Sequence, residues 1–260
     1  MSPLKRAAAP LAVIAALVAL WELAARWELL ADLFEIKPYL VPAPSDVVQS
    51  LWENRELLLD NAWVTFGEVG LGFALAVAVG LAFAVALHLS PVLKRAFYPL
   101  VVGSQTIPII VVAPVLVAWL GFGIGPKVAI IALICFFPIT VNTLDGLGKV
   151  EEEQRKMLRT LGAGRARIFT ALELPTALPY LLSGAKIAVA VAVIGAVFGE
   201  WAGSSEGLGH LMLLDNSQLE MARVFAAMTV LSAMAIALFG LLALLERKVA
   251  WWRPESQDPR

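Results

Sequence analysis

The motif Gly203-Ser-Ser205-Glu-Gly207 has the form Gly-x-Ser-x-Gly, which presents a nucleophilic serine in α/β hydrolases. That chemistry needs a strand-to-helix turn in a sheet and a histidine partner, yet the sequence predicts no sheet and contains only His88 and His210. The sequence also lacks the ligands of a metal site, because two histidines and one cysteine, Cys135, form no ligand set at the usual spacing. The single cysteine also excludes a disulfide framework. The sequence therefore favours neither a hydrolase nor a metalloprotein.

The composition is that of a membrane protein. Of 260 residues, 60% are hydrophobic and 16% charged, and the mean hydropathy is +0.80, whereas soluble domains have roughly 45–50% apolar and about 25% charged residues. Several charge-free runs reach the roughly 20 residues that a helix needs to cross a bilayer. A net charge of −1 argues against a nucleic-acid partner. We expect an all-α integral membrane protein with several crossings.

Six segments are predicted to cross the membrane, and their flanking charges predict the orientation. If both ends are cytoplasmic, 14 of the 20 basic residues lie in cytoplasmic segments and five in outer ones, as the positive-inside rule requires. The first apolar run also resembles a signal peptide, but it extends through Trp21 and Glu22 without a convincing cleavage site, which favours a crossing. The predicted crossings are residues 7–25, 62–89, 96–120, 127–147, 177–200 and 221–246.

These crossings divide the chain into three parts. Residues 1–61 hold the first crossing and an external loop with an interfacial helix, for which contact with a soluble partner is the alternative. Residues 62–246 form a core of five crossings with a cytoplasmic loop at 148–175, and residues 247–260 form a cytoplasmic tail. Within the core, Gly121-Phe-Gly-Ile-Gly-Pro126 predicts a tight turn.

Polar residues inside the crossings are candidates for a solute pathway or gate. Lys186 lies about 15 Å into its helix, at 1.5 Å per residue, and is expected to pair with Glu68 or Asp145. Glu200 is either a gate or solute-contact residue or an interfacial anchor. Uncharged polar residues at such depth either line a pathway or bond between helices. The candidates are Gln105, Thr106, Asn142, Thr143, Lys186, Glu200 and Trp201.

The cytoplasmic loop is the most informative stretch of the chain. Two short amphipathic helices are predicted at 150–161 and 163–172, separated by Gly162, because glycine commonly ends one helix and turns the chain into the next. Leu174-Pro175 is expected to stop the second helix before the fifth crossing. Short helices with apolar and basic faces beneath a membrane bundle are suited to docking into a groove of a soluble partner.

This loop resembles the cytoplasmic signature of permease subunits of bacterial binding-protein-dependent ABC importers, which reads Glu-Ala-Ala, three residues, Gly, nine residues, Ile, one residue, Leu-Pro. Gly162 takes the glycine, Leu172 the isoleucine and Leu174-Pro175 the final pair, whereas Lys156-Met157-Leu158 departs from Glu-Ala-Ala. Motifs elsewhere are similar to the nitrate/sulfonate/taurine branch, and residues 199–209 resemble permeases for the hydroxymethylpyrimidine precursor of thiamine. The matching motifs include Val41-Pro-Ala-Pro-Ser45, Gln105-Thr-Ile-Pro108, Phe137-Pro138 and Leu161-Gly-Ala-Gly-Arg165.

The resemblance implies a type I ABC importer permease fold in the bacterial inner membrane. It also implies two ABC ATPase subunits, a second permease subunit that is expected to be identical, and a periplasmic or lipid-anchored substrate-binding protein. The chain has no Walker A sequence, since Val150 follows Gly148-Lys149, so ATP and Mg are expected at the partner ATPase and no cofactor on this chain. The residues implied in ATPase coupling are Arg155, Met157, Leu158, Arg159, Leu161, Gly162, Ala163, Arg165, Ile168, Phe169, Leu172, Leu174 and Pro175.

The resemblance implies a small-molecule solute, and a thiamine-precursor pyrimidine is favoured. Sulfonate, taurine or nitrate remain alternatives. A different class, an ion-coupled secondary transporter, would need an intramembrane carboxylate relay and two homologous halves, and neither is visible in the sequence. A membrane-embedded enzyme would need clustered His, Asp or Cys residues, which the chain lacks.

Overall fold

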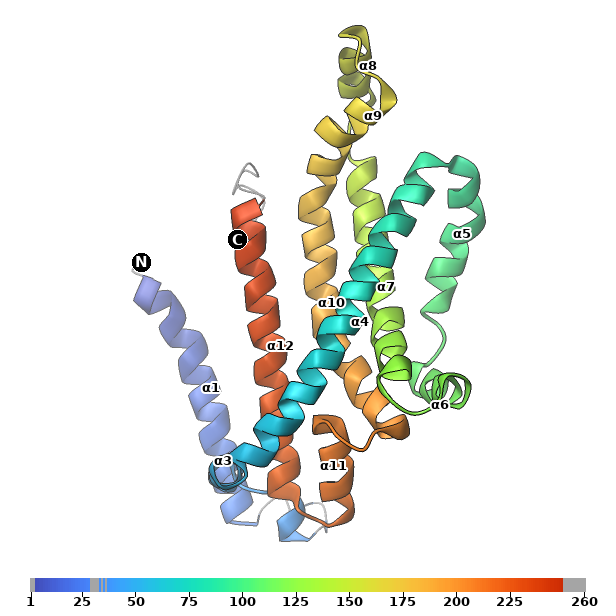
Figure 1. The fold of residues 1–260 in the computed structure, drawn as a ribbon. Coiled ribbons are helices and arrows are strands. Elements are labelled where there is room, and N and C mark those ends of the chain that lie inside the picture. Colours follow the sequence, from blue (N-terminus) through green and yellow to red (C-terminus); the bar gives the residue numbers. More distant parts are fainter. Residues whose placement is uncertain (1–2, 29–32, 34, 36, 250–260) are drawn as a thin grey trace. The chain divides into compact units, whose positions relative to one another are not determined.

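The computed structural model describes residues 3–28, 33, 35 and 37–249, and every regular element within them is a helix (Figure 1). In chain order the helices are α1 (Pro3–Arg26), η1 (Pro38–Leu40), α3 (Pro44–Glu53), α4 (Arg55–Leu89), α5 (Pro91–Ser104), α6 (Ile109–Leu120), α7 (Ile124–Gly148), α8 (Glu152–Thr160), α9 (Arg165–Ile168), the π-helical η2 (Phe169–Glu173), α10 (Leu174–Gly203), α11 (Leu208–Ser217) and α12 (Met221–Val249).

Four stretches of the described chain are long and apolar enough to cross a membrane. They are α4, α7, α12 and the continuous helix Arg165–Gly203, and the pair α5 and α6 adds a fifth if it counts as one span. These stretches confirm a multi-pass, all-helical protein. The first predicted crossing coincides with the helix α1, and its assignment as a sixth span stays a prediction.

The third predicted crossing, 96–120, is wrong as a single helix, because α5 and α6 are bent by 102° relative to each other. Pro108 precedes α6 with extended backbone (φ −65°, ψ 118°) and has no N–H to continue a helix. It also disfavours helical backbone at the residue before it. The Ser104 and Thr106 hydroxyls donate to the carbonyls of Val101 (2.7 Å) and Gly103 (2.8 Å), which holds the chain in turns at the break.

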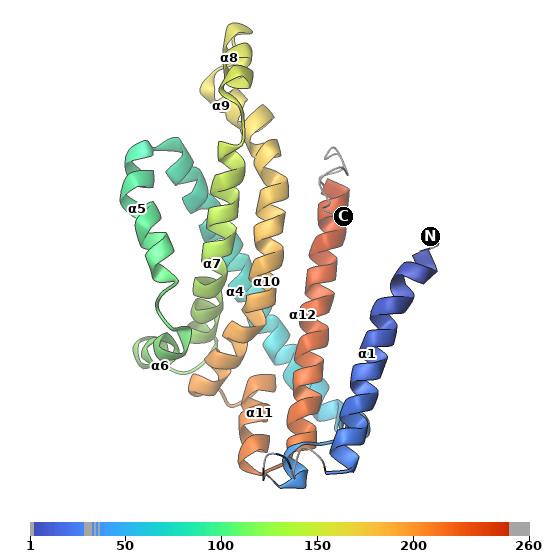
Figure 2. The same cartoon turned by 180° about the vertical axis from the view of Figure 1, so that it is seen from behind.

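The chain forms two compact units, Met1–Val64 with Glu206–Ser232 and Thr65–Ser205 with Ala233–Arg260. In the second unit α7 and α10 run side by side, as both views show (Figure 2). Their interface is close because it is built from small residues. A Cβ on Gly184 of α10 would come within 2.5 Å of the Pro138 carbonyl oxygen of α7. Such close contact along two long helices makes this pair the rigid centre of the unit.

Within the second unit, α4 and α5 pack on α7. Ala84 and Leu87 of α4 form a buried cluster with Leu144 of α7. The Phe83 ring lies beside this cluster and contacts the ring of Phe97 on α5, with centroids 6.0 Å apart. These contacts hold α4 and α5 against α7.

The first unit is fastened mainly by ionic contacts. Glu22 of α1 accepts a hydrogen bond from the Ser45 backbone N–H (3.0 Å), which ties α1 to α3, and another from the Arg26 guanidinium of its own helix (2.5 Å). Arg223 at the start of α12 pairs with the buried carboxylate of Asp215 in α11 at 2.6 Å. These contacts place the ends of short helices whose apolar area alone is small.

Candidate functional site

The predicted coupling loop occupies α8, α9 and η2 at the Gly148 end of the α7–α10 pair (Figure 1). The expected helix at 150–161 is shorter in the structure, at Glu152–Thr160. The expected helix at 163–172 begins at Arg165 and does not end at residue 172, because α9 continues through η2. The expectation that Leu174-Pro175 stops the second helix is wrong, because the chain passes through η2 directly into α10. Pro175 is tolerated because it lies in the first turn of α10, directly after a π turn that alters the hydrogen-bond pattern.

The turn between α8 and α9 depends on Gly162, which has a positive φ of 81°. Its N–H donates to the Arg159 carbonyl (2.9 Å), and the Ala163 N–H donates to the Leu158 carbonyl (3.0 Å). These two bonds form the Schellman motif that ends α8. A side chain at position 162 would strain this backbone, so the expectation from the sequence that glycine forms the turn has a physical cause.

The residues implied in coupling fall into two groups in the structure. The first group is exposed and accessible to a partner, whereas the second is half-buried or buried and holds the loop together. The exposed residues are Met157, Arg159, Leu161, Gly162 and Arg165, and the others are Arg155, Leu158, Ala163, Ile168, Phe169, Leu172, Leu174 and Pro175.

A buried carboxylate, Glu173, anchors the loop. Its Oε1 accepts a hydrogen bond from Arg155 Nε at 2.7 Å, and its Oε2 lies 3.0 Å from His88 Nε2 at the end of α4. Arg165 adds a second attachment to the same end by donating to the Leu89 carbonyl at 2.8 Å. Sequence reasoning missed Glu173 and His88 as part of this site. The available signal was a lone acid at the end of the loop and a lone histidine at the end of a crossing.

The uncharged pathway candidates separate into two places. Gln105 lies at the break between α5 and α6 and lines a pocket of about 480 Å³, next to Thr106 in the same break. Asn142 and Thr143 instead donate to carbonyls of their own helix, those of Pro138 (2.7 Å) and Ile139 (2.6 Å). These two bonds satisfy the side chains within α7 and do not join it to another helix.

The ion pairs differ from those expected. Lys186 pairs with Glu246 of α12 at 2.5 Å, so the predicted pairing with Glu68 or Asp145 is wrong. Glu68 pairs instead with Lys127 of α7, and both side chains are buried. Which acid meets which lysine depends on how each helix is rotated about its axis, and the sequence of an almost uniformly apolar helix does not reveal that rotation.

Thr65, Glu68, Lys127 and Glu200 form one buried group, named the charge cluster, at the Gly203 end of the α7–α10 pair. The Thr65 hydroxyl donates to Glu200 Oε1 at 2.6 Å, and Lys127 Nζ donates to Glu68 and, at 2.9 Å, to Ser204 Oγ. The cluster joins α4, α7 and α10 and contains two carboxylates for one ammonium group. Trp201, the last gate candidate, is exposed beside it, with its ring 5.8 Å from that of Phe198.

Known proteins that resemble this chain are membrane components of transport systems. Residues 76–251 match the family described as binding-protein-dependent transport system inner membrane component. The chain is 38% identical over 231 residues to the formylaminopyrimidine transport permease protein ThiX of Halalkalibacterium halodurans, covering 88% of this chain and 92% of that protein. It is 27% identical to the taurine transport system permease protein TauC of Escherichia coli over 238 residues, covering 89% and 86%.

A solved structure extends the comparison to the fold. A chain of the MetNI methionine ABC transporter in an inward-facing conformation superposes with a TM-score of 0.65, covering 75% of this chain and 97% of that chain at 19% identity. That likeness shows the type I ABC importer permease fold. The chain belongs to the family of binding-protein-dependent transport system inner membrane components, as the membrane-spanning permease subunit of an ABC importer.

Proposed function

We propose that this permease pairs with a second copy of itself in the bacterial inner membrane to form the translocation pathway of an ATP-driven importer. It crosses the membrane six times with both termini cytoplasmic, and ATP and Mg bind to separate ATPase subunits. In this orientation the Gly148 end of the α7–α10 pair faces the cytoplasm. The distribution of basic residues supports it, because most of them then lie in cytoplasmic segments. A substrate-binding protein delivers the solute to the opposite end.

The coupling loop receives the motion of the ATPase subunits. Its exposed side chains, such as Met157 and Leu161, offer apolar contact area next to basic Arg159. Its buried side is fastened by Glu173 to Arg155 and to the end of α4. A displacement of α8 is therefore transmitted to the transmembrane helices rather than absorbed by a flexible connection. The observation that carries the proposal is this combination of exposed apolar side chains at Met157 and Leu161 with the ionic anchor at Glu173.

The solute is a thiamine-precursor pyrimidine such as hydroxymethylpyrimidine. Support comes from the 38% identity to a formylaminopyrimidine permease over nearly the whole of both chains, together with the Gly-rich segment 199–209. A sulfonate such as taurine is the second candidate, favoured by the similarity to a taurine permease.

Purification with the co-encoded ATPase and binding protein tests this function. We expect the ATPase to copurify and the complex in proteoliposomes to take up hydroxymethylpyrimidine only with ATP inside and binding protein outside. Uptake of taurine without uptake of hydroxymethylpyrimidine would identify taurine as the solute instead. Uptake driven by an ion gradient, without any ATPase, would contradict the importer mechanism.

A further inference from the structure

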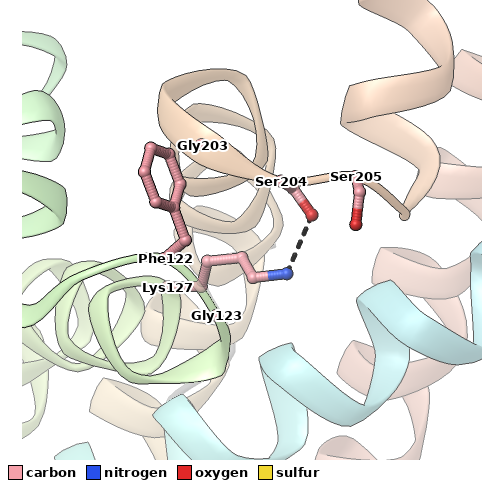
Figure 3. A pocket seen from close by; sticks show the side chains of 6 residues that line it. All are labelled: Phe122, Gly123, Lys127, Gly203, Ser204 and Ser205. Atoms are coloured by element: carbon pink, nitrogen blue, oxygen red, sulfur yellow. Dashed lines mark hydrogen bonds between the residues drawn. The ribbon is translucent and has the colours of Figure 1, made fainter.

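A pocket of about 490 Å³ adjoins the charge cluster at the Gly203 end of the α7–α10 pair (Figure 3). Its lining comes from the connection between α6 and α7 with the first turn of α7, and from the end of α10 with the segment that follows. The lining consists of Phe122, Gly123, Lys127, Gly203, Ser204 and Ser205. A volume of this size is within the range of small-molecule sites, about 300–1,000 Å³.

The aromatic wall of the pocket is held by a glycine groove on α10. A Cβ on Gly203 would lie 3.0 Å from two ring atoms of Phe122, so the ring rests directly on this glycine. One turn earlier, a Cβ on Gly199 would lie 3.3 Å from Lys127 Cα and Cγ, so the base of the Lys127 side chain rests on this glycine. The groove thus positions both an aromatic ring and an ammonium group. Phe122 remains 84% exposed, which leaves its ring available to a planar molecule.

The polar wall can bond a solute directly. Lys127 Nζ has three N–H groups, of which Glu68 and Ser204 accept two. The third can donate to a ring nitrogen or carbonyl. In Figure 3 the Ser204 and Ser205 hydroxyls lie on the same side as this ammonium group. Hydroxyls both donate and accept, so they complement exocyclic amino and hydroxyl groups.

The charge of the site disfavours anions. Lys127 is paired with Glu68, and Glu200 lies in the same cluster because it accepts from Thr65, three residues before Glu68 on α4. With all groups ionised the cluster is net negative, and with one proton bound it is neutral. Lys127 is the charged side chain that lines the pocket, and the cluster behind it has no net positive charge in either state to attract a sulfonate or nitrate ion.

We propose that this pocket is a solute-contact site of the permease itself, which accepts a neutral or cationic nitrogen heteroaromatic ring and excludes small anions. The ring stacks on Phe122 while Lys127 and the two serines bond its polar edge. This inference rests on the proposed function, which places the pocket at the outer end of the pathway. It adds that solute selection is not left to the binding protein alone.

Thiol labelling of Ser205→Cys in the assembled complex tests the site. The natural cysteine, Cys135, is fully buried, so a membrane-impermeant maleimide reports the introduced thiol. We expect hydroxymethylpyrimidine to slow labelling at least fivefold and taurine to leave the rate unchanged. Ser217→Cys, at an exposed serine at the end of α11, is the matched control whose labelling neither solute changes.

Phe122→Leu supplies a second readout in the complex with native serines. Loss of stacking should raise the concentration of radiolabelled hydroxymethylpyrimidine needed for half-saturation about three- to tenfold in equilibrium binding without binding protein. The proposal would be overturned if hydroxymethylpyrimidine gave no protection up to its solubility limit, or if taurine protected equally. Unchanged binding of the pyrimidine by Phe122→Leu would overturn it as well. Neither assay needs ATP, so ATP-driven pyrimidine uptake without protection refutes the site and leaves the proposed function intact.

Discussion

Gly162→Ala is expected to weaken docking of the ATPase subunit through backbone strain alone. Position 162 has φ +81°, and a Cβ built there meets no atom of the described residues within 4 Å, so the substitution removes no contact and creates no clash. The left-handed conformation costs a residue with a Cβ roughly 1–2 kcal/mol. In the free permease, α8 can relax this strain because the turn is surrounded by open space. We expect the docked state to require the turn, so that the strain remains there.

The expected loss follows from that difference. If the full strain opposes docking, the affinity of the ATPase subunit falls about 5- to 30-fold. The measurement is the dissociation constant of the purified ATPase subunit for the detergent-solubilised permease, with uptake in proteoliposomes as the functional readout.

Gly164→Ala is the matched control, because it is the same substitution two residues away. Gly164 has φ −70° and ψ 167°, which alanine adopts without strain, and a Cβ there also meets open space. Gly164 precedes α9 as its N-cap, where glycine is preferred to alanine by roughly 0.5–1 kcal/mol of helix stability. This cost applies to the free and the docked permease alike. We expect a change in affinity within about twofold. Equal losses for both substitutions, or no loss for Gly162→Ala, would refute the argument from backbone conformation.

Three further substitutions test other contacts. Arg155→Ala leaves the buried carboxylate of the loop without its closest cation, so ATP-driven uptake should fall strongly while membrane insertion persists, and normal uptake would contradict the anchor. Gly184→Ala would place a Cβ 2.5 Å from a backbone oxygen, whereas Gly240→Ala meets open space. We expect only the former to lower the melting temperature, by the roughly 1–3 kcal/mol typical of overpacking. Lys127→Met removes the cation that pairs with the buried Glu68 carboxylate and should destabilise by about 3–5 kcal/mol in thermal unfolding; an unchanged midpoint would show that the pair is dispensable.

Hydropathy located most of the membrane segments because a bilayer sets a minimum apolar length. The predicted crossings at 62–89, 127–147, 177–200 and 221–246 coincide with α4, α7, α10 and α12. Their ends differ by several residues because helices continue past the apolar window. The break at 105–108 was not predictable in the same way. A proline in an apolar run is compatible with both a kink and a complete interruption, and only the surrounding packing decides between them.

The two ends of the site were predictable to different degrees. The turn at Gly162 follows from local chemistry, since a helix that must reverse needs a residue tolerant of positive φ. The charge cluster depends on which faces of α4, α7 and α10 meet. The sequence places Lys127 among the outer basic residues because it begins a crossing, and nothing in the local sequence distinguishes a lysine at the interface from one buried against Glu68.

The close packing of α7 and α10 connects these two ends physically. Near the coupling loop, a Cβ on Gly146 would lie 2.7 Å from the Tyr180 Cβ. Near the charge cluster, a Cβ on Gly199 would lie 3.3 Å from Lys127 Cα. Between these two places, a Cβ on Gly184 would lie 2.5 Å from the Pro138 carbonyl oxygen. Helices that pack on glycines at several points leave no room to slide past each other without side chains clashing, so we expect them to move as one body. On the proposed mechanism, a shift of the coupling loop would therefore displace Lys127 and the pocket beside it together with the helix pair, and a solute bound there would respond to the ATPase.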